Sequence, residues 1–271
     1  EIIELKNIKN YFREASWNEA LVFAAGGLLK IKDDHGHRSL AGLGSAKGSN
    51  EEAYLFQKLI RTGFGNNNVD HCTRLCHASS VAAMLEMLGS AAVSNQVADI
   101  GQTDVAIIIG ANPTVNHPVA ATFMKTAAKN SVKIIVIDPY RSELTRHSEY
   151  FLQIRPDTDV ALLNSLMHVI IDEELFDKKF VEKRTENFDQ IRCTVSRYSP
   201  EEVAPICGIS APEIRNVALL YAKAPKAMIF WGMGISQHIH GTDNARCLIS
   251  LALLCGHIGS CLLYTSDAAD E

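Results

Sequence analysis

The chain has 271 residues, of which 47% are hydrophobic, so it can bury one large core or two smaller ones. Its 26 basic and 31 acidic residues give a formal net charge of -5, which excludes a broad cationic surface for a nucleic acid backbone. The longest apolar runs fall far short of the ~20 residues that a membrane span needs, and no secretory signal peptide opens the chain.

The first elements predict a strand, a loop and a helix. Residues 39–50, "SLAGLGSAKGSN", indicate a strand that leads into a glycine- and serine-rich loop, and the helical pattern "EEAYLFQKLIR" follows. We expect this segment to be part of a second α/β domain, residues 1–71. The chain opens inside a patterned segment, so we also expect residues to be missing before Glu1.

In the middle of the chain, buried strands alternate with helices. The apolar runs "VAIIIG" (105–110) and "KIIVID" (133–138) are typical of strands covered on both faces. The helical patterns "HPVAATFMKTAAKN" and "DTDVALLNSLMHVIIDEEL" (157–175) follow them. Asp157 or Thr158 is the expected N-cap of the second helix.

The last third of the natural sequence continues this alternation. "SAPEIRNVALLYAKA" opens with a capping box formed by Ser210 and Glu213, "KAMIFWGMG" predicts a strand that ends in glycines, and "TDNARCLISLALLCG" predicts a helix. Strands that alternate with helices predict a doubly wound, mostly parallel, Rossmann-like α/β sheet over residues 72–260.

The final stretch, "CLLYTSDAADE" (261–271), has no periodicity and resembles the translation of a sequencing adapter. We expect it to be a non-native tail and exclude it from the fold. The natural chain is therefore expected to be a fragment, with residues missing at both ends.

The chain has seven cysteines, an odd number. Their spacing is not dense and regular, as it is in small disulfide scaffolds. A reducing compartment, the cytoplasm, is therefore expected. The cysteines outside residues 72–76 lie mostly in apolar patterns that are typical of a core.

The segment "DHCTRLCHASSV" places Cys76 and His77 just before a helix predicted to begin near residues 79–80. The positive end of that helix, together with Arg74, would favour a thiolate, and a histidine can carry a proton. The thiolate could be a nucleophile or a metal ligand, against the alternative of an inert buried thiol. Cys72 and Cys76 have no second pair at zinc spacing, so a structural zinc site is not expected.

Polar segments follow the predicted strands, where open α/β sheets bind ligands. Gly110 would let the backbone approach a ligand, Asn112 and His117 offer hydrogen bonds, and Asp138 could hold a ribose or a purine edge. The acids of "RPDTD" (155–159) could accept from the N–H groups of guanine. Each of these residues is also common in turns, but together they predict a nucleotide-bearing cofactor. The lack of a GxGxxG motif counts against a plain NAD site.

In this order, the motifs resemble those of the molybdopterin oxidoreductases of the dimethyl-sulfoxide-reductase type, and within them the formate dehydrogenase alpha subunit. "NNNVDHCTRLCHASSV" is similar to the active-site segment in which a cysteine or selenocysteine ligates molybdenum or tungsten and a histidine follows. The similarity runs from about Phe12 to Gly259. It implies that Cys76 is the metal ligand and that His77 takes the proton of formate.

The resemblance also implies a bis-molybdopterin guanine dinucleotide with Mo or W, and a [4Fe-4S] cluster in a region before Glu1. Two positions depart from the family, because Asp157 stands where glycine is common and Tyr140 where arginine is common. The residues implied to bind the cofactor are Ser45 and Asn50 for the second pterin, and Gly110, Asn112, Pro113, Thr114, His117, Asp138, Tyr140, Arg141, Asp157, Thr158, Asp159, Met233, Gly234 and Gln237.

The implied function is oxidation of formate or reduction of carbon dioxide, with iron-sulfur or flavin subunits as electron-transfer partners. Two alternatives are a related assimilatory nitrate reductase and a non-catalytic electron-transfer subunit of the same fold. His77 directly after Cys76 favours formate, and the pair argues against a subunit without catalysis. The family's catalytic arginine is expected after "GHIG", beyond this sequence, so the polypeptide alone is expected to be inactive. Neither nucleic acid nor a membrane is expected as a partner.

Overall fold

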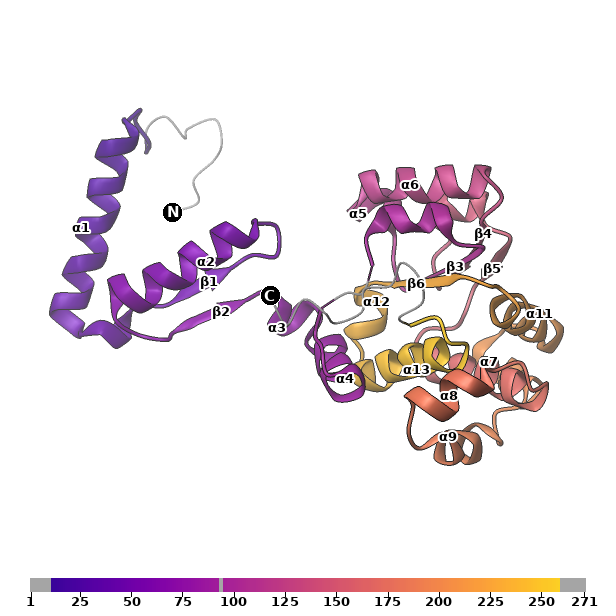
Figure 1. The fold of residues 1–271 in the computed structure, drawn as a ribbon. Helices are drawn as coiled ribbons and strands as arrows, with labels where there is room; N and C mark the ends of the chain where they lie inside the picture. The colour runs from indigo at the N-terminus through magenta and orange to yellow at the C-terminus, as the bar shows by residue number, and fades with distance from the viewer. Residues whose placement is uncertain (1–10, 93–94, 259–271) are drawn as a thin grey trace. The chain divides into compact units, whose positions relative to one another are not determined.

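The computed structural model describes residues 11–92 and 95–258. They form two compact units, divided between Arg74 and Leu75 (Figure 1). The division lies close to the domain boundary expected after residue 71. Within the described residues, none of the helices combines the length and the hydropathy that a membrane span requires.

The N-terminal unit contains a two-stranded parallel sheet, β1 with β2, and helix α2 lies between the two strands in the chain. The hydroxyl of Ser49 accepts from the backbone N–H of Glu52, and the Glu52 carboxylate accepts from the N–H of Ser49, so a capping box fixes the start of α2. The elements of this unit are α1 (Trp17–His35), the 3-10 helix η2 (His37–Ser39), β1 (Gly42–Gly44), α2 (Asn50–Lys58), the π-helix η3 (Leu59–Phe64) and β2 (Val69–His71).

The C-terminal unit is built on a four-stranded, fully parallel sheet in the order β5-β4-β3-β6. The central strands are runs of isoleucine and valine, as expected for strands that helices cover on both faces. The strands are β3 (Val105–Ile109), β4 (Lys133–Ile137), β5 (Tyr150–Leu152) and β6 (Ala227–Trp231).

Helices lie on both faces of this sheet, which confirms the expected doubly wound α/β fold (Figure 1). Helix α6 and the 3-10 helix η4 pack on one face, and α7, α11 and α13 pack on the other. The helices after β2 are α3 (Thr73–Cys76), α4 (Ala78–Leu88), η4 (Val97–Gln102), α5 (Pro113–Asn116), α6 (Pro118–Lys129), η5 (Glu143–His147), α7 (Asp159–Asp172), α8 (Lys178–Arg184), α9 (Phe188–Val195), α10 (Pro200–Cys207), α11 (Ala211–Ala222), α12 (Met233–Ser236) and α13 (Gly241–Leu254).

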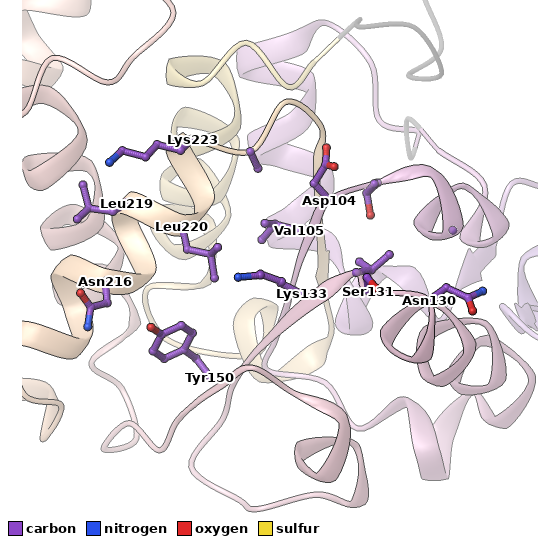
Figure 2. Close-up of a pocket in the computed structure, with 14 residues that line it drawn as sticks. Asp104, Val105, Asn130, Ser131, Lys133, Tyr150, Asn216, Leu219, Leu220 and Lys223 are labelled. Atoms are coloured by element: carbon purple, nitrogen blue, oxygen red, sulfur yellow. The ribbon is translucent and has the colours of Figure 1, made fainter.

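The strands begin at one end of the sheet, which we call the amino end, and finish at the other, the carboxyl end. An open cavity of about 560 Å³ lies at the amino end, where Leu220 of α11 faces Lys133 and Tyr150 (Figure 2). The Lys133 ammonium is 3.9 Å from the Glu149 carboxylate. Helices α6 and α11 finish at this end. Because the C-terminus of a helix carries a partial negative charge, the two helices disfavour binding of an anion in this cavity. None of the cofactor-binding residues implied by the sequence lines this cavity.

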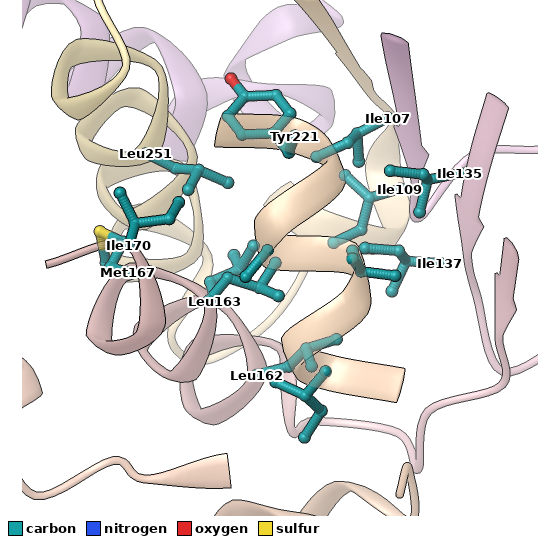
Figure 3. Close-up of a cluster of buried hydrophobic side chains, with 14 of the residues drawn as sticks. Ile107, Ile109, Ile135, Ile137, Leu162, Leu163, Met167, Ile170, Tyr221 and Leu251 are labelled. Atoms are coloured by element: carbon teal, nitrogen blue, oxygen red, sulfur yellow. The ribbon is translucent and has the colours of Figure 1, made fainter. Parts of the chain in front are cut away.

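Alternate residues of each central strand serve two different cores. Ile107 and Ile109 of β3 face the larger core, which α7, α11 and α13 complete (Figure 3). Ala106 and Ile108, which alternate with them in the chain, face the smaller core with α6 and η4. This alternation follows from the two-residue period of a strand and leaves neither face of β3 in contact with water.

Two local features differ from those expected. The helix predicted over 157–175 is shorter, since α7 spans Asp159–Asp172. Thr158 holds the N-cap position, as one of the two expected residues, but its side chain makes no capping bond; its hydroxyl donates to the Arg155 carbonyl oxygen at 2.7 Å. Strand β5 was not predicted from the sequence.

The expectation of core cysteines holds for most of them. Cys207 is buried, and burial raises the pKa of both Cys247 and Cys255 to about 12. Cys193 is exposed on α9, so the expectation was wrong there. The expected non-native tail, 261–271, lies outside the described residues.

Candidate functional site

The backbones that follow β3 and β6 touch at two glycines at the carboxyl end. Gly110 has a left-handed φ of 57°, and its carbonyl oxygen accepts from the N–H of Gly234 at 3.0 Å. A Cβ at position 110 would lie 2.8 Å from the carbonyl carbon of Gly234, and one at position 234 would lie 2.7 Å from the Cα of Gly110. Glycine at both positions therefore allows a close approach between two segments of this chain, and the approach of Gly110 to a ligand stays a prediction.

A short polar segment follows β3. Asn112 holds the N-cap position of α5, and its side-chain oxygen accepts from the Thr114 hydroxyl at 2.6 Å. Pro113 is buried as the first residue of α5, and His117 holds the N-cap position of α6. These four implied binding residues lie together immediately beyond β3.

Asp138 starts a tight turn directly after β4. Its N–H donates to the carbonyl oxygen of Leu152 at 3.2 Å, and its carboxylate accepts from the N–H of Tyr140 at 2.7 Å. Burial raises the pKa of the Asp138 carboxyl, although the bond from Tyr140 acts against that rise. The Tyr140 side chain is exposed, and the Arg141 guanidinium lies 4.4 Å from the centre of the Phe151 ring.

The turn between β5 and α7 carries two of the implied acids in different surroundings. Asp157 is exposed, has a left-handed φ of 66°, and places its carboxylate 3.3 Å from Nδ1 of His238. Asp159, the first residue of α7, is only 6% exposed. Burial raises the pKa of the Asp159 carboxyl, His238 acts against that rise, and the charges of Asp157 and Asp138 add to it.

Cys76 and His77 are attached to the segment that follows β6, residues 232–238, which includes the short helix α12 and which we call the loop after β6. The Ser236 hydroxyl donates to the carbonyl oxygen of Cys76 at 2.8 Å, and the Gln237 side-chain amide donates to that of Leu75 at 3.3 Å. Two implied groups, the Cys76–His77 pair and the Met233–Gln237 segment, therefore lie side by side.

Helix α4 fixes this attachment from the other side. The Ser79 hydroxyl donates to the carbonyl oxygen of Ser236 at 2.6 Å, and the indole N–H of Trp231 donates to the Ser80 hydroxyl at 2.9 Å. Helix α4 also packs on α13 through Ala83 and Ala245. The position of Cys76 thus depends on contacts between segments about 160 residues apart in the chain.

Cys76 is the last residue of α3 and is partly buried. His77 holds the N-cap position of α4, which begins at Ala78, slightly earlier than the sequence indicated, and its side chain makes no capping bond. Burial lowers the pKa of His77, which favours the neutral imidazole. A neutral imidazole next to a thiol is able to accept a proton.

Ser45 and Asn50 belong to the N-terminal unit. The Ser45 hydroxyl oxygen accepts from the N–H of Lys47 at 3.2 Å, and Asn50 is the first residue of α2. Their role beside a second pterin stays a prediction.

Sequence reasoning missed two residues at the carboxyl end. Ser236 lies inside the motif "WGMGISQ" and His238 directly follows it, but neither residue type signals a partner elsewhere in the chain. Only the fold brings Ser236 to Cys76 and His238 to Asp157.

Comparison with known proteins identifies relatives of this arrangement. The model of the molybdopterin oxidoreductase family matches residues 4–264. Formate dehydrogenase H of Escherichia coli (strain K12) is 42% identical over 245 residues, which are 90% of this chain and 34% of that protein. The F420-dependent formate dehydrogenase subunit alpha of Methanocaldococcus jannaschii is 40% identical over 248 residues, 92% of this chain and 36% of that protein.

A solved structure, acetylene hydratase from Pelobacter acetylenicus, has a TM-score of 0.77 at 27% identity and covers 92% of this chain and 34% of its own. The chain spans about a third of the length of these two formate dehydrogenases. Because the family match extends over nearly the whole sequence and the parallel sheet has the expected architecture, the chain belongs to the molybdopterin oxidoreductase family.

Proposed function

We propose that this chain is a segment of the catalytic subunit of a molybdenum- or tungsten-dependent formate dehydrogenase, which oxidises formate to carbon dioxide. The attachment of Cys76 and His77 to the loop after β6, at the carboxyl end of the sheet, is the observation that carries this proposal. The relatives named formate dehydrogenase favour formate over nitrate. The neighbour named acetylene hydratase has a similar fold, so the fold by itself does not specify the reaction.

The side chains at this site fit a molybdopterin cofactor. The partly buried Cys76 offers a soft thiolate, which suits molybdenum or tungsten. In the part of the chain that the structure describes, no three His, Cys, Asp or Glu side chains are grouped so that they could hold a metal ion. A metal held by the cofactor would need only Cys76 as a ligand from this part of the chain.

The guanine dinucleotide form of the cofactor is proposed from Asp159. Its carboxylate is buried at the carboxyl end, and burial raises its pKa, so its charge is incompletely compensated. The adjacent N–H groups on the edge of a guanine ring would supply that compensation. Gly110, Asn112, Asp138 and Met233, which follow the neighbouring strands, would line the rest of the nucleotide.

The proton balance assigns a role to His77. Formate gives carbon dioxide, one proton and two electrons, and the bound cofactor supplies the two-electron acceptor. The neutral imidazole that burial favours can accept the proton. We further propose that the electrons pass to a [4Fe-4S] cluster outside this sequence and to iron-sulfur or flavin subunits, in the cytoplasm.

A chimera tests this proposal. Residues 12–258 would replace the aligned segment of the Escherichia coli formate dehydrogenase H, and formate-dependent dye reduction would be measured together with metal content. We expect activity in the chimera and none in the 271-residue chain alone, because the chain spans about a third of that relative.

Within the chimera, Cys76→Ala should abolish turnover and remove the protein thiolate contribution from the X-ray absorption spectrum of the metal. Cys193→Ala, which removes an exposed thiol on α9, is the matched control and should keep full activity. Unchanged turnover in the Cys76→Ala chimera would refute the assignment. Reduction of nitrate in place of formate oxidation would favour the alternative reductase.

A further inference from the structure

One ion pair crosses the carboxyl end of the sheet. Asp157 lies in the turn after β5 and His238 in the loop after β6, and these strands are the two outer strands in the order β5-β4-β3-β6. Three strand spacings separate them, about 14 Å. Even so, the Asp157 carboxylate and Nδ1 of His238 are 3.3 Å apart. The pair therefore joins two segments that leave the sheet from its opposite edges.

The backbone of Asp157 is adapted to this contact. Its φ of 66° is left-handed, a conformation that glycine adopts without steric penalty and that aspartate tolerates better than most other residues. Glycine would therefore satisfy the backbone, and only the contact with His238 uses the side chain. The aspartate at this position thus adds a connection that glycine would lack.

The acidic side chains around His238 determine which residues it attracts. Asp157 and Asp159 are two positions apart and repel each other, and Asp138 adds to the repulsion at Asp159. The His238 ring lies against the Asp157 carboxylate, and its charge, when the imidazole is protonated, is opposite to that of Asp159. In that form it attracts both acids of the turn toward the loop after β6.

We infer that Asp157 and His238 form a clasp that joins the turn after β5 to the loop after β6 and holds the Asp159 carboxylate in position for the guanine of the cofactor. This inference rests on the proposed function. His238 is a positioning residue, because it acts through Asp157 and Asp159. The clasp sets the preference for a guanine nucleotide by fixing the acceptor that recognises it.

The other end of α7 supplies a matched control. Glu174 follows α7, also has a left-handed φ, 52°, and also forms an exposed ion pair, 2.7 Å from Nζ of Lys178. Like Asp157→Gly, Glu174→Gly relieves a left-handed φ at a non-glycine residue and removes an exposed carboxylate contact, but it does so away from the carboxyl end. The difference between the two variants isolates the effect of the location.

The test uses the 271-residue chain with GDP and ADP as probes. Asp157→Gly and His238→Gln should each speed amide hydrogen exchange across residues 233–238 and weaken GDP binding by about 2- to 5-fold, the range for an exposed ion pair. The preference for GDP over ADP should narrow. The double variant should be no worse than either single one, since the two changes remove the same contact. Glu174→Gly should change neither measurement.

Unchanged exchange in both single variants, or additive effects in the double variant, would overturn the clasp. The proposed nucleotide site fails separately. It fails if the unmodified chain does not bind GDP saturably, or if Asp159→Asn binds GDP as well as the unmodified chain does. Faster exchange with no change in the GDP preference would leave the contact in place and refute its role in positioning.

Discussion

The two ends of the four-stranded sheet use their polar residues differently. At the amino end, the Asp104 carboxylate accepts from the backbone N–H of Lys226 at 3.0 Å, and Lys133 lies near Glu149. At the carboxyl end, burial raises the pKa of Asp138 and Asp159 and lowers that of His77. These three residues are among those that the sequence implied for the cofactor and for the proton, and perturbed pKa values are common at sites of binding and chemistry.

His77 gives the largest expected difference between the ends. In the active chimera, His77→Ala should lower formate turnover by about 10²- to 10⁴-fold, the usual contribution of one positioned acid or base, while metal content stays unchanged. Tyr150→Phe, at the amino end, should leave turnover unchanged. Loss of metal together with activity would make His77 a structural support, and full activity would remove it from the mechanism.

Substitutions of glycine by alanine compare the packing at the two ends of the sheet through their effect on the free energy of unfolding. Gly234→Ala would place a Cβ 2.7 Å from the backbone of Gly110, so urea unfolding should show a loss of about 1–3 kcal/mol, as for other overpacked sites. Gly101 lines the cavity at the amino end, and a Cβ there would meet no atom within 4 Å. Gly101→Ala should therefore be close to neutral. Equal effects at the two positions would contradict the close packing of the glycines.

Substitution of aspartate by asparagine should change the free energy of unfolding in opposite directions at the two ends of the sheet. Asp159→Asn removes a buried charge, so the free energy of unfolding of the ligand-free chain at pH 7 should rise by about 0.5–2 kcal/mol. Asp104→Asn weakens the hydrogen bond from the Lys226 N–H and should lower the free energy of unfolding slightly. Destabilisation by Asp159→Asn would show that its carboxylate already has sufficient partners within the chain.

The smallest expected effect is a pH dependence. His257 packs edge-on against Tyr221, whose helix finishes at the amino end, and burial lowers the pKa of His257 below its usual 6.5. The unfolded chain then takes up this proton first, so the contribution of His257 to stability is complete above pH 6.5 and falls as the pH decreases through that value.

Asp138 and Asp159 act in the opposite direction. Their pKa values are raised above 3.8, so the folded chain takes up their protons first, and the penalty at neutral pH is relieved as the pH falls toward 3.8. Urea unfolding of His257→Gln from pH 7 to pH 5 should therefore show a smaller loss of stability on acidification than the unmodified chain. If the free energy of unfolding fell equally in the variant and in the unmodified chain between pH 7 and pH 5, His257 would not be the source of the loss.

The parts of the fold that depend on local pattern could be predicted. The isoleucine runs identified β3 and β4, and the capping box of Ser210 and Glu213 is present at the start of α11. Strand β5 was missed because it has three residues, and its pairing with β4 rather than a pattern of its own defines it. A short strand of this kind depends on its neighbour, which a local pattern does not reveal.

The candidate site divides in the same way. Asp138 was identified because it follows a predicted strand, and the carboxyl end of a parallel sheet is where ligands bind. Asp159 was identified because it stands at the start of a predicted helix. The partner of Gly110 is a glycine more than 120 positions later, and no local signal connects the two. For Asp157, the sequence drew attention to an acid where glycine is common, and its left-handed φ supplies the physical reason for that glycine.

The strand order also has a consequence for synthesis on the ribosome. Strand β3 pairs with β4 and β6, but Ala227, the first residue of β6, is 118 positions after Ile109, the last residue of β3. At about 5–20 residues per second, roughly 6–24 s pass between the two during translation. One edge of β3 stays unpaired for that time, exposed to wrong partners. The contact between Gly234 and Gly110 likewise forms only after β6 has been synthesised.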